Sequence, residues 1–283
     1  MTNNSKSIRA KLLFISKIEN ISFQLMLIRY FLERLLYRIS LSEYKNTFCL
    51  KGGVLLYLFE ERKSRPTMDI DFLATNTENE PKNLKAIFSN ICKINYDVDA
   101  VTFDNQTISV SEIIKQGNYN GIRISLIARL DTIKQRIQID IGFGDKVYPN
   151  PVLVYYPVIL DMEQPKNKVY SIYSAIAEKF EAMIQLSEAN SRMKDFYDVF
   201  TLLTINEINR FELEEAIKLT FKTRKTVISD NHSIFQDQFY KNSERLNQWN
   251  AFKKKAKIID APEFAMVMEF IKTELEPIYK LIK

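Results

Sequence analysis

The sequence predicts a mixed α/β unit with flanking helices, followed by a bundle of helices. Strand-like alternation of polar and apolar residues is confined to residues 45–160, prolines cluster at 149–165, and helical periodicity continues from 168 to the end. The 283 residues also exceed the roughly 100–150 of a usual single core. We therefore expect two domains, at residues 1–165 and 166–283.

The elements of the first domain follow from local patterns. Apolar residues recur at helical intervals from Ile8 to Ser42, without proline or glycine, which predicts one or two helices. A short apolar run then meets a glycine pair, and 54–59 has the pattern of a second helical run. The remaining predicted elements are a strand at 65–73, a helix at 83–93, and strands at 121–128 and 136–141.

The prolines at 149–165 mark a connecting segment that cannot be a continuous helix. Beyond it, short polar turns separate segments with helical periodicity, which is typical of a bundle. The predicted helices are 171–188, 192–204, 210–224, 233–255 and 262–281.

Composition excludes several classes of protein. The two cysteines have no paired spacing, so neither a disulfide framework nor a cysteine zinc site is expected. No stretch is long and apolar enough for a membrane span, and we expect a cytoplasmic protein with no membrane partner. With 40 Lys and Arg against 35 Asp and Glu, the net charge of +5 is compatible with a polyanionic partner.

The main chemical signal is the pair Asp69 and Asp71. Residues two apart in a strand point to the same face, so two carboxylates share one surface. Their repulsion would raise one pKa unless a cation lay between them, and Mg²⁺ suits carboxylates combined with waters and phosphates. The alternative interpretation is an ordinary solvated strand face.

The surrounding sequence favours phosphate chemistry. Gly52 and Gly53 lie between an apolar run and a helix, where backbone N–H groups can approach a phosphate. Asp140 supplies a third carboxylate on another predicted strand. Three acidic groups on neighbouring strands suit two-metal phosphoryl or nucleotidyl transfer. A P-loop is absent from the sequence, and Gly142 and Gly144 lack the third glycine of a dinucleotide fingerprint.

Four motifs, in this order along the chain, resemble the AbiEii/AbiGii toxin family of nucleotidyltransferases. The first motif combines the glycine pair within residues 48–53 with the Asp-x-Asp within residues 65–71. The other three motifs lie at residues 139–145, 177–182 and 192–198. The resemblance covers roughly residues 25–205. Gly53 departs from the serine common in the wider superfamily, so backbone N–H groups would have to replace its hydroxyl.

The resemblance implies a nucleotidyltransferase-fold core of the DNA-polymerase-β type with a helical domain. It also implies use of Mg²⁺, with Mn²⁺ as the alternative, and of a nucleoside triphosphate. It further implies an RNA acceptor such as the tRNA 3′ end, and a role as the toxin of a bacterial toxin–antitoxin or phage-defence pair, with an antitoxin as protein partner. By position, the resemblance implies that Asp69 and Asp71 hold the metal, that Lys179 contacts the triphosphate and that Asp195 completes the site. Together with the residue patterns above, we expect the metal ligands Asp69, Asp71 and Asp140 and the catalytic residues Asp69, Asp71, Lys179 and Asp195. The expected nucleotide-binding residues are Gly52, Gly53, Arg65, Thr67, Lys179 and Arg192.

Other interpretations of these residues remain open. Lys179 lies on the flank of an apolar helical stripe, where its stem could cover the core while its ammonium stays in water. Asp195 could simply favour the positive end of its helix, and Lys194 with Asp198 could form an i,i+4 pair. The alternative for the whole protein is a nucleotide-binding or RNA-binding module of the same fold without turnover.

Overall fold

The computed structural model describes residues 3–60, 65–115, 119–258 and 260–283. The chain folds into two compact units. The first unit comprises Met1–Leu58, Pro66–Gly144 and Val152–Val169, and the second comprises Phe59–Arg65, Asp145–Pro151 and Tyr170–Lys283. Each unit therefore includes segments distant in sequence, and the division into domains at 165/166 stays a prediction.

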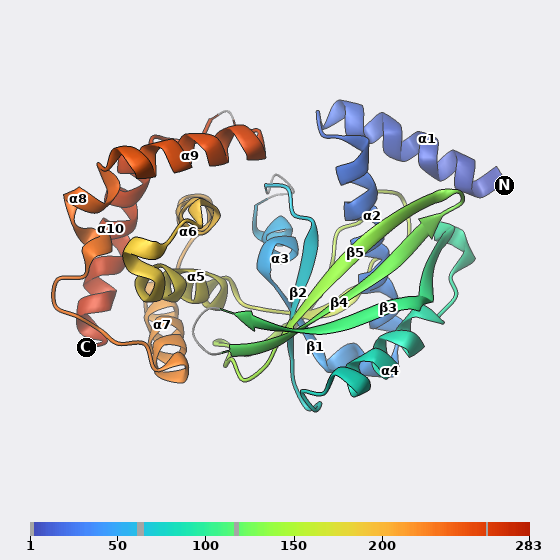
Figure 1. Cartoon of the computed structure of the whole chain (residues 1–283), viewed down its shortest axis with the longest axis horizontal. Helices are drawn as coiled ribbons and strands as arrows, with labels where there is room; N and C mark the ends of the chain where they lie inside the picture. The colour runs from blue at the N-terminus through green and yellow to red at the C-terminus, as the bar shows by residue number, and fades with distance from the viewer. Residues whose placement is uncertain (1–2, 61–64, 116–118, 259) are drawn as a thin grey trace. The chain divides into compact units, whose positions relative to one another are not determined.

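The first unit contains a seven-stranded mixed sheet with the order β3-β4-β5-β2-β1-β7-β6. β2 and β5 are parallel, as are β1 and β7, and the other neighbours are antiparallel. Figure 1 shows β3, β4 and β5 as the long strands of this sheet. The strands are β1 (Phe48–Lys51), β2 (Asp69–Ala74), β3 (Val101–Lys115), β4 (Tyr119–Leu130), β5 (Ile133–Gly142), β6 (Val152–Tyr155) and β7 (Lys166–Val169).

Helices α2 and α4 pack against each other and against the sheet, α2 on β5 and β7 and α4 on β3. α2 begins where Ser22 Oγ accepts a hydrogen bond from the Leu25 N–H, and it is buried around most of its circumference. Its buried Arg38 is paired with Asp99, so this charge carries its counterion into the core. The helices of this unit are α1 (Asn3–Ile18), α2 (Phe23–Leu41), α3 (Gly52–Phe59) and α4 (Pro81–Cys92), with 3-10 turns η1 (Glu43–Asn46) and η2 (Asp97–Asp99).

The second unit is helical, with an aromatic core. Phe180 contacts Phe221 and Tyr279, and Phe196 contacts Phe264. These rings join four of the helices. The helices are α5 (Ile172–Leu186), α6 (Met193–Ile205), α7 (Arg210–Arg224), α8 (Asp237–Tyr240), α9 (Ser243–Ala256) and α10 (Phe264–Leu281), with 3-10 turns η3 (Ser187–Ala189) and η4 (Ser233–Phe235).

The predicted mixed sheet with flanking helices and C-terminal helical region are confirmed, while three element predictions need correction. The helix expected over 233–255 is divided into η4, α8 and α9, because Asn242 caps α9 by accepting from the Glu244 N–H. The strand expected from 65 begins only at Asp69, after Pro66, which has no N–H for a ladder. The proline-rich segment contributes two strands, β6 and β7, which begin directly after Pro151 and Pro165.

Candidate active site

The Asp69 and Asp71 side chains lie on the same face of β2. The intervening Ile70 and the following Phe72 are 0% and 1% exposed. The Phe72 ring contacts Phe48, whose ring contacts Phe88 of α4. Because side chains alternate along a strand, the aspartates point to the face opposite α4, as the spacing predicts.

A row of charged residues crosses four adjacent strands on this face. Asp71 is in register with Lys51 of β1 on one side and with Asp140 of β5 on the other. Asp140 is in turn in register with Arg123 of β4. Residues in register share a face, so the row carries the charges +, −, −, + in strand order. The register thus places the third predicted carboxylate beside the Asp69 and Asp71 pair.

Arg123 binds Asp140 through two parallel hydrogen bonds. Nε lies 2.8 Å from Oδ1 and Nη2 lies 2.8 Å from Oδ2. The Asp140 side chain is 7% exposed and that of Arg123 is 39% exposed. The hydrogen bonds to Asp140 raise the pKa of Arg123, against the effect of burial, and attraction by Asp140, Asp69 and Asp71 adds to the shift. Sequence reasoning missed this arginine.

The glycine pair lies directly against the aspartates. Gly52 has φ +68, and a β-carbon there would lie 2.1 Å from Oδ2 of Asp71. A β-carbon at Gly53 would lie 2.8 Å from Oγ1 of Thr67, and that hydroxyl donates to Oδ1 of Asp69 at 2.8 Å. Only glycine fits the first position without strain. The beginning of α3 therefore adjoins the acidic pair.

The chemistry of the donor set fits a divalent cation at Asp69 and Asp71. Carboxylate oxygens are the ligands that Mg²⁺ prefers, together with water and phosphate oxygens. Asp140 is next to them but its two oxygens are both bound to Arg123. Within the described part of the chain, no three Asp, Glu, His or Cys side chains are grouped so as to hold one metal ion. The ligand role of Asp140 stays a prediction.

The second unit contains a separate cluster around Lys179 of α5. Its ammonium lies 3.1 Å from Oδ1 of Asp195 and 2.7 Å from Oδ2 of Asp198. Arg65 also binds Asp198, with Nε 2.7 Å from Oδ1 and Nη2 2.8 Å from Oδ2. Arg192 Nε lies 2.7 Å from Oδ2 of Asp195. Two aspartates one helical turn apart on α6 thus hold three cations.

Burial and charge act against each other in this cluster. Burial alone would raise the pKa of Asp198, but attraction by Lys179 and Arg65 holds it below its usual range. Burial would lower the pKa of Lys179, but attraction by Asp198 and Asp195 raises it. The Lys179 ammonium is therefore paired and charged. The predicted i,i+4 partner of Asp198, Lys194, is replaced by Lys179 and Arg65.

Glu60 is a further member of this cluster that sequence reasoning missed. Its side chain is buried, and Oε1 has no hydrogen-bond partner among the described residues. Burial and the negative charge of Asp198 raise the pKa of Glu60 to about 8, against the attraction of Arg65 and Lys179. This carboxyl is therefore largely protonated at neutral pH. No local sequence signal marks it, since Asp198 and Lys179 are distant from it in sequence.

The structure thus gathers the predicted residues into two groups. The first unit brings together six of them, and the second unit brings together four. The first group is Gly52, Gly53, Thr67, Asp69, Asp71 and Asp140, and the second is Arg65, Lys179, Arg192 and Asp195.

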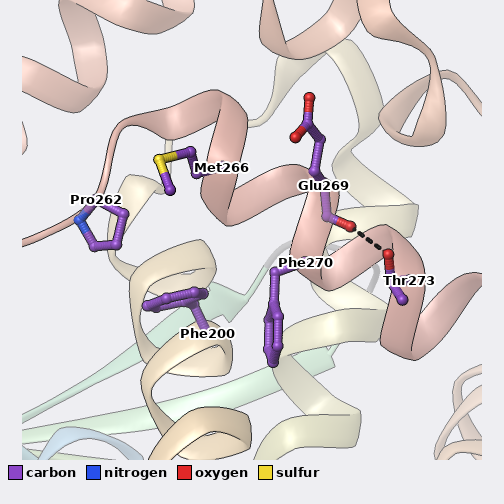
Figure 2. Close-up of a pocket in the computed structure, with 6 residues that line it drawn as sticks. All are labelled: Phe200, Pro262, Met266, Glu269, Phe270 and Thr273. Atoms are coloured by element: carbon purple, nitrogen blue, oxygen red, sulfur yellow. Dashed lines mark hydrogen bonds between the residues drawn. The ribbon is translucent and has the colours of Figure 1, made fainter.

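A pocket of about 350 Å³ lies between α6 and α10 in the second unit (Figure 2). Apolar side chains dominate its wall, and Glu269 and Thr273 of α10 are its polar members. None of the predicted site residues contributes to it. Its lining residues are Phe200, Pro262, Met266, Glu269, Phe270 and Thr273.

The mixed sheet presents an Asp-x-Asp strand against a glycine pair, and the family model that matches this chain is that of a nucleotidyltransferase, so the protein is an enzyme of this class. The family model described as nucleotidyl transferase AbiEii toxin, type IV toxin–antitoxin system, matches residues 34–269. The chain therefore belongs to the AbiEii nucleotidyltransferase family, as the sequence motifs predict. A search among curated proteins gives no significant match.

Three solved structures match this chain along most of their own length. A candidate nucleotidyltransferase from H. pylori is 15% identical, with a TM-score of 0.50, over 90% of this chain and 95% of that chain. JHP933 from Helicobacter pylori is 15% identical, with a TM-score of 0.47, over 88% and 89% of the two chains. An antigenic nucleotidyltransferase-like protein from Paracoccidioides brasiliensis is 12% identical, with a TM-score of 0.41, over 72% and 94%. At this identity, the first of these matches supports the fold alone.

Proposed function

We propose that the protein transfers a nucleoside monophosphate from a nucleoside triphosphate to the 3′ hydroxyl of an RNA, with tRNA as the acceptor, and acts as the toxin of a toxin–antitoxin pair. The observation that carries the proposal is the contact between Gly52 and the Asp71 carboxylate at the beginning of α3. A carboxylate pair beside a helix N-terminus suits a metal-bound phosphate chain.

Each residue has a role in this proposal. Asp69 and Asp71 would hold Mg²⁺ or Mn²⁺, and Thr67 orients Asp69 through its hydrogen bond. A bound divalent ion supplies charge stabilisation to the phosphates and makes the attacking hydroxyl more acidic. Gly52 and Gly53 let the beginning of α3 lie directly against the Asp71 and Thr67 side chains, and the backbone N–H groups there would bind phosphate oxygens.

The cations of the second unit would contact the phosphates, a role that rests on the family resemblance. Lys179, Arg65 and Arg192 carry the charge, and Asp195 with Asp198 orients them. In the reaction, the 3′ hydroxyl oxygen forms a bond to the α-phosphorus and the bond to the β-phosphate oxygen breaks. Pyrophosphate leaves, and the hydroxyl proton passes to solvent.

The partners follow from the family as well. A nucleoside triphosphate is the donor, and an antitoxin is the expected protein partner. No helix among the described residues combines the length and the apolar character needed to cross a bilayer. We assign the protein to the cytoplasm, where the two buried cysteines, Cys49 and Cys92, remain reduced.

The test is transfer of labelled nucleotide. The protein is incubated with each α-labelled nucleoside triphosphate, Mg²⁺ or Mn²⁺, and bulk tRNA, and the RNA is separated on a denaturing gel. Wild type should label the RNA, and Asp71→Asn should reduce labelling at least about 100-fold. The matched control is Asp104→Asn, which removes an aspartate of β3 that pairs with Arg129. Full activity of Asp71→Asn would contradict the proposal.

A non-catalytic module of the same fold is the second candidate. The observation in its favour is that Asp140 and Lys179 are both held by ion pairs within the protein. Tight triphosphate binding with no labelled product, under all metals and with all four nucleotides, would support this function instead.

A further inference from the structure

The pairing of Arg123 with Asp140 has a consequence for metal binding, and the inference drawn from it rests on the proposed function. Both Asp140 oxygens accept from the guanidinium at 2.8 Å. The amide oxygen of Gln138, when turned toward Arg123, accepts from the same guanidinium at 3.1 and 3.2 Å. A carboxylate whose two oxygens are both engaged has little capacity left for a metal ion.

Arg123 is much more exposed to solvent than an arginine that pairs with an aspartate inside the core. Its side chain is 39% exposed, whereas the buried Arg38 that pairs with Asp99 is 1% exposed. A guanidinium at the surface can move from its carboxylate to water or another anion without itself becoming a buried unpaired charge. Asp140, whose side chain is 7% exposed, then needs another cation, such as a metal ion, as its partner. The planar fork of donors that fits a carboxylate also fits a phosphate.

We propose that Arg123 competes with a divalent metal ion for Asp140, and that the guanidinium binds the triphosphate once it is displaced. The ion pair then protects the three neighbouring carboxylates from mutual repulsion when no metal is bound. When metal is bound, the same arginine adds a positive charge for the phosphate chain. Arg123 is thus a triphosphate-binding residue supplied by β4.

The chain offers a matched control on the same strand. Arg129 lies six residues after Arg123 on β4, so both point to the same face. Its Nη2 lies 2.7 Å from Oδ2 of Asp104, and the two side chains are 32% and 22% exposed. Arg129 therefore lies on the same strand and the same face as Arg123, and it also pairs with an aspartate. Its partner, however, is not a proposed metal ligand.

The experiment measures Mn²⁺ affinity and triphosphate affinity separately in the full-length chain. Mn²⁺ is titrated without nucleotide into wild type, Arg123→Gln, Arg123→Lys and Arg129→Gln by calorimetry. A non-hydrolysable nucleoside triphosphate is then titrated in saturating Mn²⁺. Thermal unfolding establishes that each variant is folded. If Arg123→Gln does not fold, Arg123→Lys replaces it, because lysine keeps the charge without the forked donors.

The expected result is a change of opposite sign in the two affinities. Arg123→Gln should bind Mn²⁺ about 10-fold more tightly, because the competitor is gone, and the triphosphate about 10-fold more weakly. If Arg123 only held Asp140 in position for the metal, its loss should instead weaken Mn²⁺ binding, by about 10–100-fold. Arg129→Gln should change neither affinity.

Unchanged or weaker Mn²⁺ binding by Arg123→Gln overturns the inference, as does unchanged triphosphate binding. A wild type that binds no Mn²⁺ overturns it too. These titrations need neither an acceptor nor turnover. A failed transfer assay combined with the opposite changes in affinity would therefore reject the proposed reaction while supporting the role of Arg123.

Discussion

Gly52 faces the carboxylate of Asp71 so closely that any β-carbon on residue 52 would lie 2.1 Å from Oδ2. Lys51, the residue before it, is in register with the same aspartate. The backbone at the end of β1 thus lies directly against one of the two proposed metal ligands. The positive φ of Gly52 and its lack of a side chain thus leave room for the Asp71 carboxylate, a proposed metal ligand.

Gly52→Ala should therefore impair both the fold and the site. A non-glycine residue at φ +68 costs about 1–2 kcal/mol, and the clash with Asp71 adds to that cost. We expect a lower urea midpoint of unfolding and at least about 10-fold less nucleotide transfer. Gly142→Ala is the control, because its β-carbon would meet only the Phe72 carbonyl oxygen, at 3.8 Å. Equal effects at the two glycines would contradict this explanation.

Removing Asp198 should destabilise the second unit. Asp198→Asn leaves Lys179 and Arg65 without a shared counterion in a buried site, and such a loss costs about 3–5 kcal/mol. Urea unfolding followed by the fluorescence of Trp249, the single tryptophan of the chain, measures the change in this unit. Glu276→Gln, which breaks the partly exposed pair with Lys280 on α10, should cost less than about 1 kcal/mol. If Asp198→Asn lowered the free energy of unfolding by less than Glu276→Gln, the stabilising role of the buried ion pairs around Asp198 would be refuted.

Glu60 should make stability fall as the pH rises. Its pKa is about 8 in the folded protein against 4.5 as the ordinary value, so between these values the unfolded chain releases a proton that the folded chain keeps. Wild type thus loses up to about 1.4 kcal/mol per pH unit across this window through this group. Glu60→Gln lacks that loss, and its free energy of unfolding should rise relative to wild type from about pH 5 to about pH 8. A difference between the two proteins that does not change with pH would disprove the prediction.

A divalent ion should stabilise the folded protein through the aspartate pair. Binding to the folded state alone adds about 2.7 kcal/mol when the free ion is at about 100 times its dissociation constant. Mn²⁺ should therefore raise the Tm of wild type and of Asp104→Asn but not that of Asp69→Asn, and a chelator should reverse the shift. An equal shift in Asp69→Asn would show that the ion binds elsewhere.

The parts of the site that the sequence predicts are those set by local spacing. Asp69 and Asp71 are expected on one strand face because alternation is a property of the strand itself. Gly52 is expected beside phosphate chemistry because a glycine pair precedes a helical run. The family motifs further identify Lys179 and Asp195, which the structure joins by an ion pair.

The parts that could not be predicted depend on pairing between distant segments. Arg123 is in contact with Asp140 only because of the register between β4 and β5, which no single segment specifies. Asp198 has a suitable partner four residues away in Lys194, yet it binds Lys179 and Arg65 instead. The helix expected over 233–255 is wrong for a local reason, since Asn242 is a capping residue within an otherwise helical pattern.

The alternation of side chains along β2 ties the burial of its apolar residues to the position of its two aspartates. Ile70 and Phe72 are buried on one side by the same backbone geometry that directs Asp69 and Asp71 to the other. Inserting or deleting one residue within this strand would exchange the two sides, sending carboxylates into the apolar interior. Natural variation in the length of this segment should therefore be strongly selected against, even where individual substitutions are tolerated.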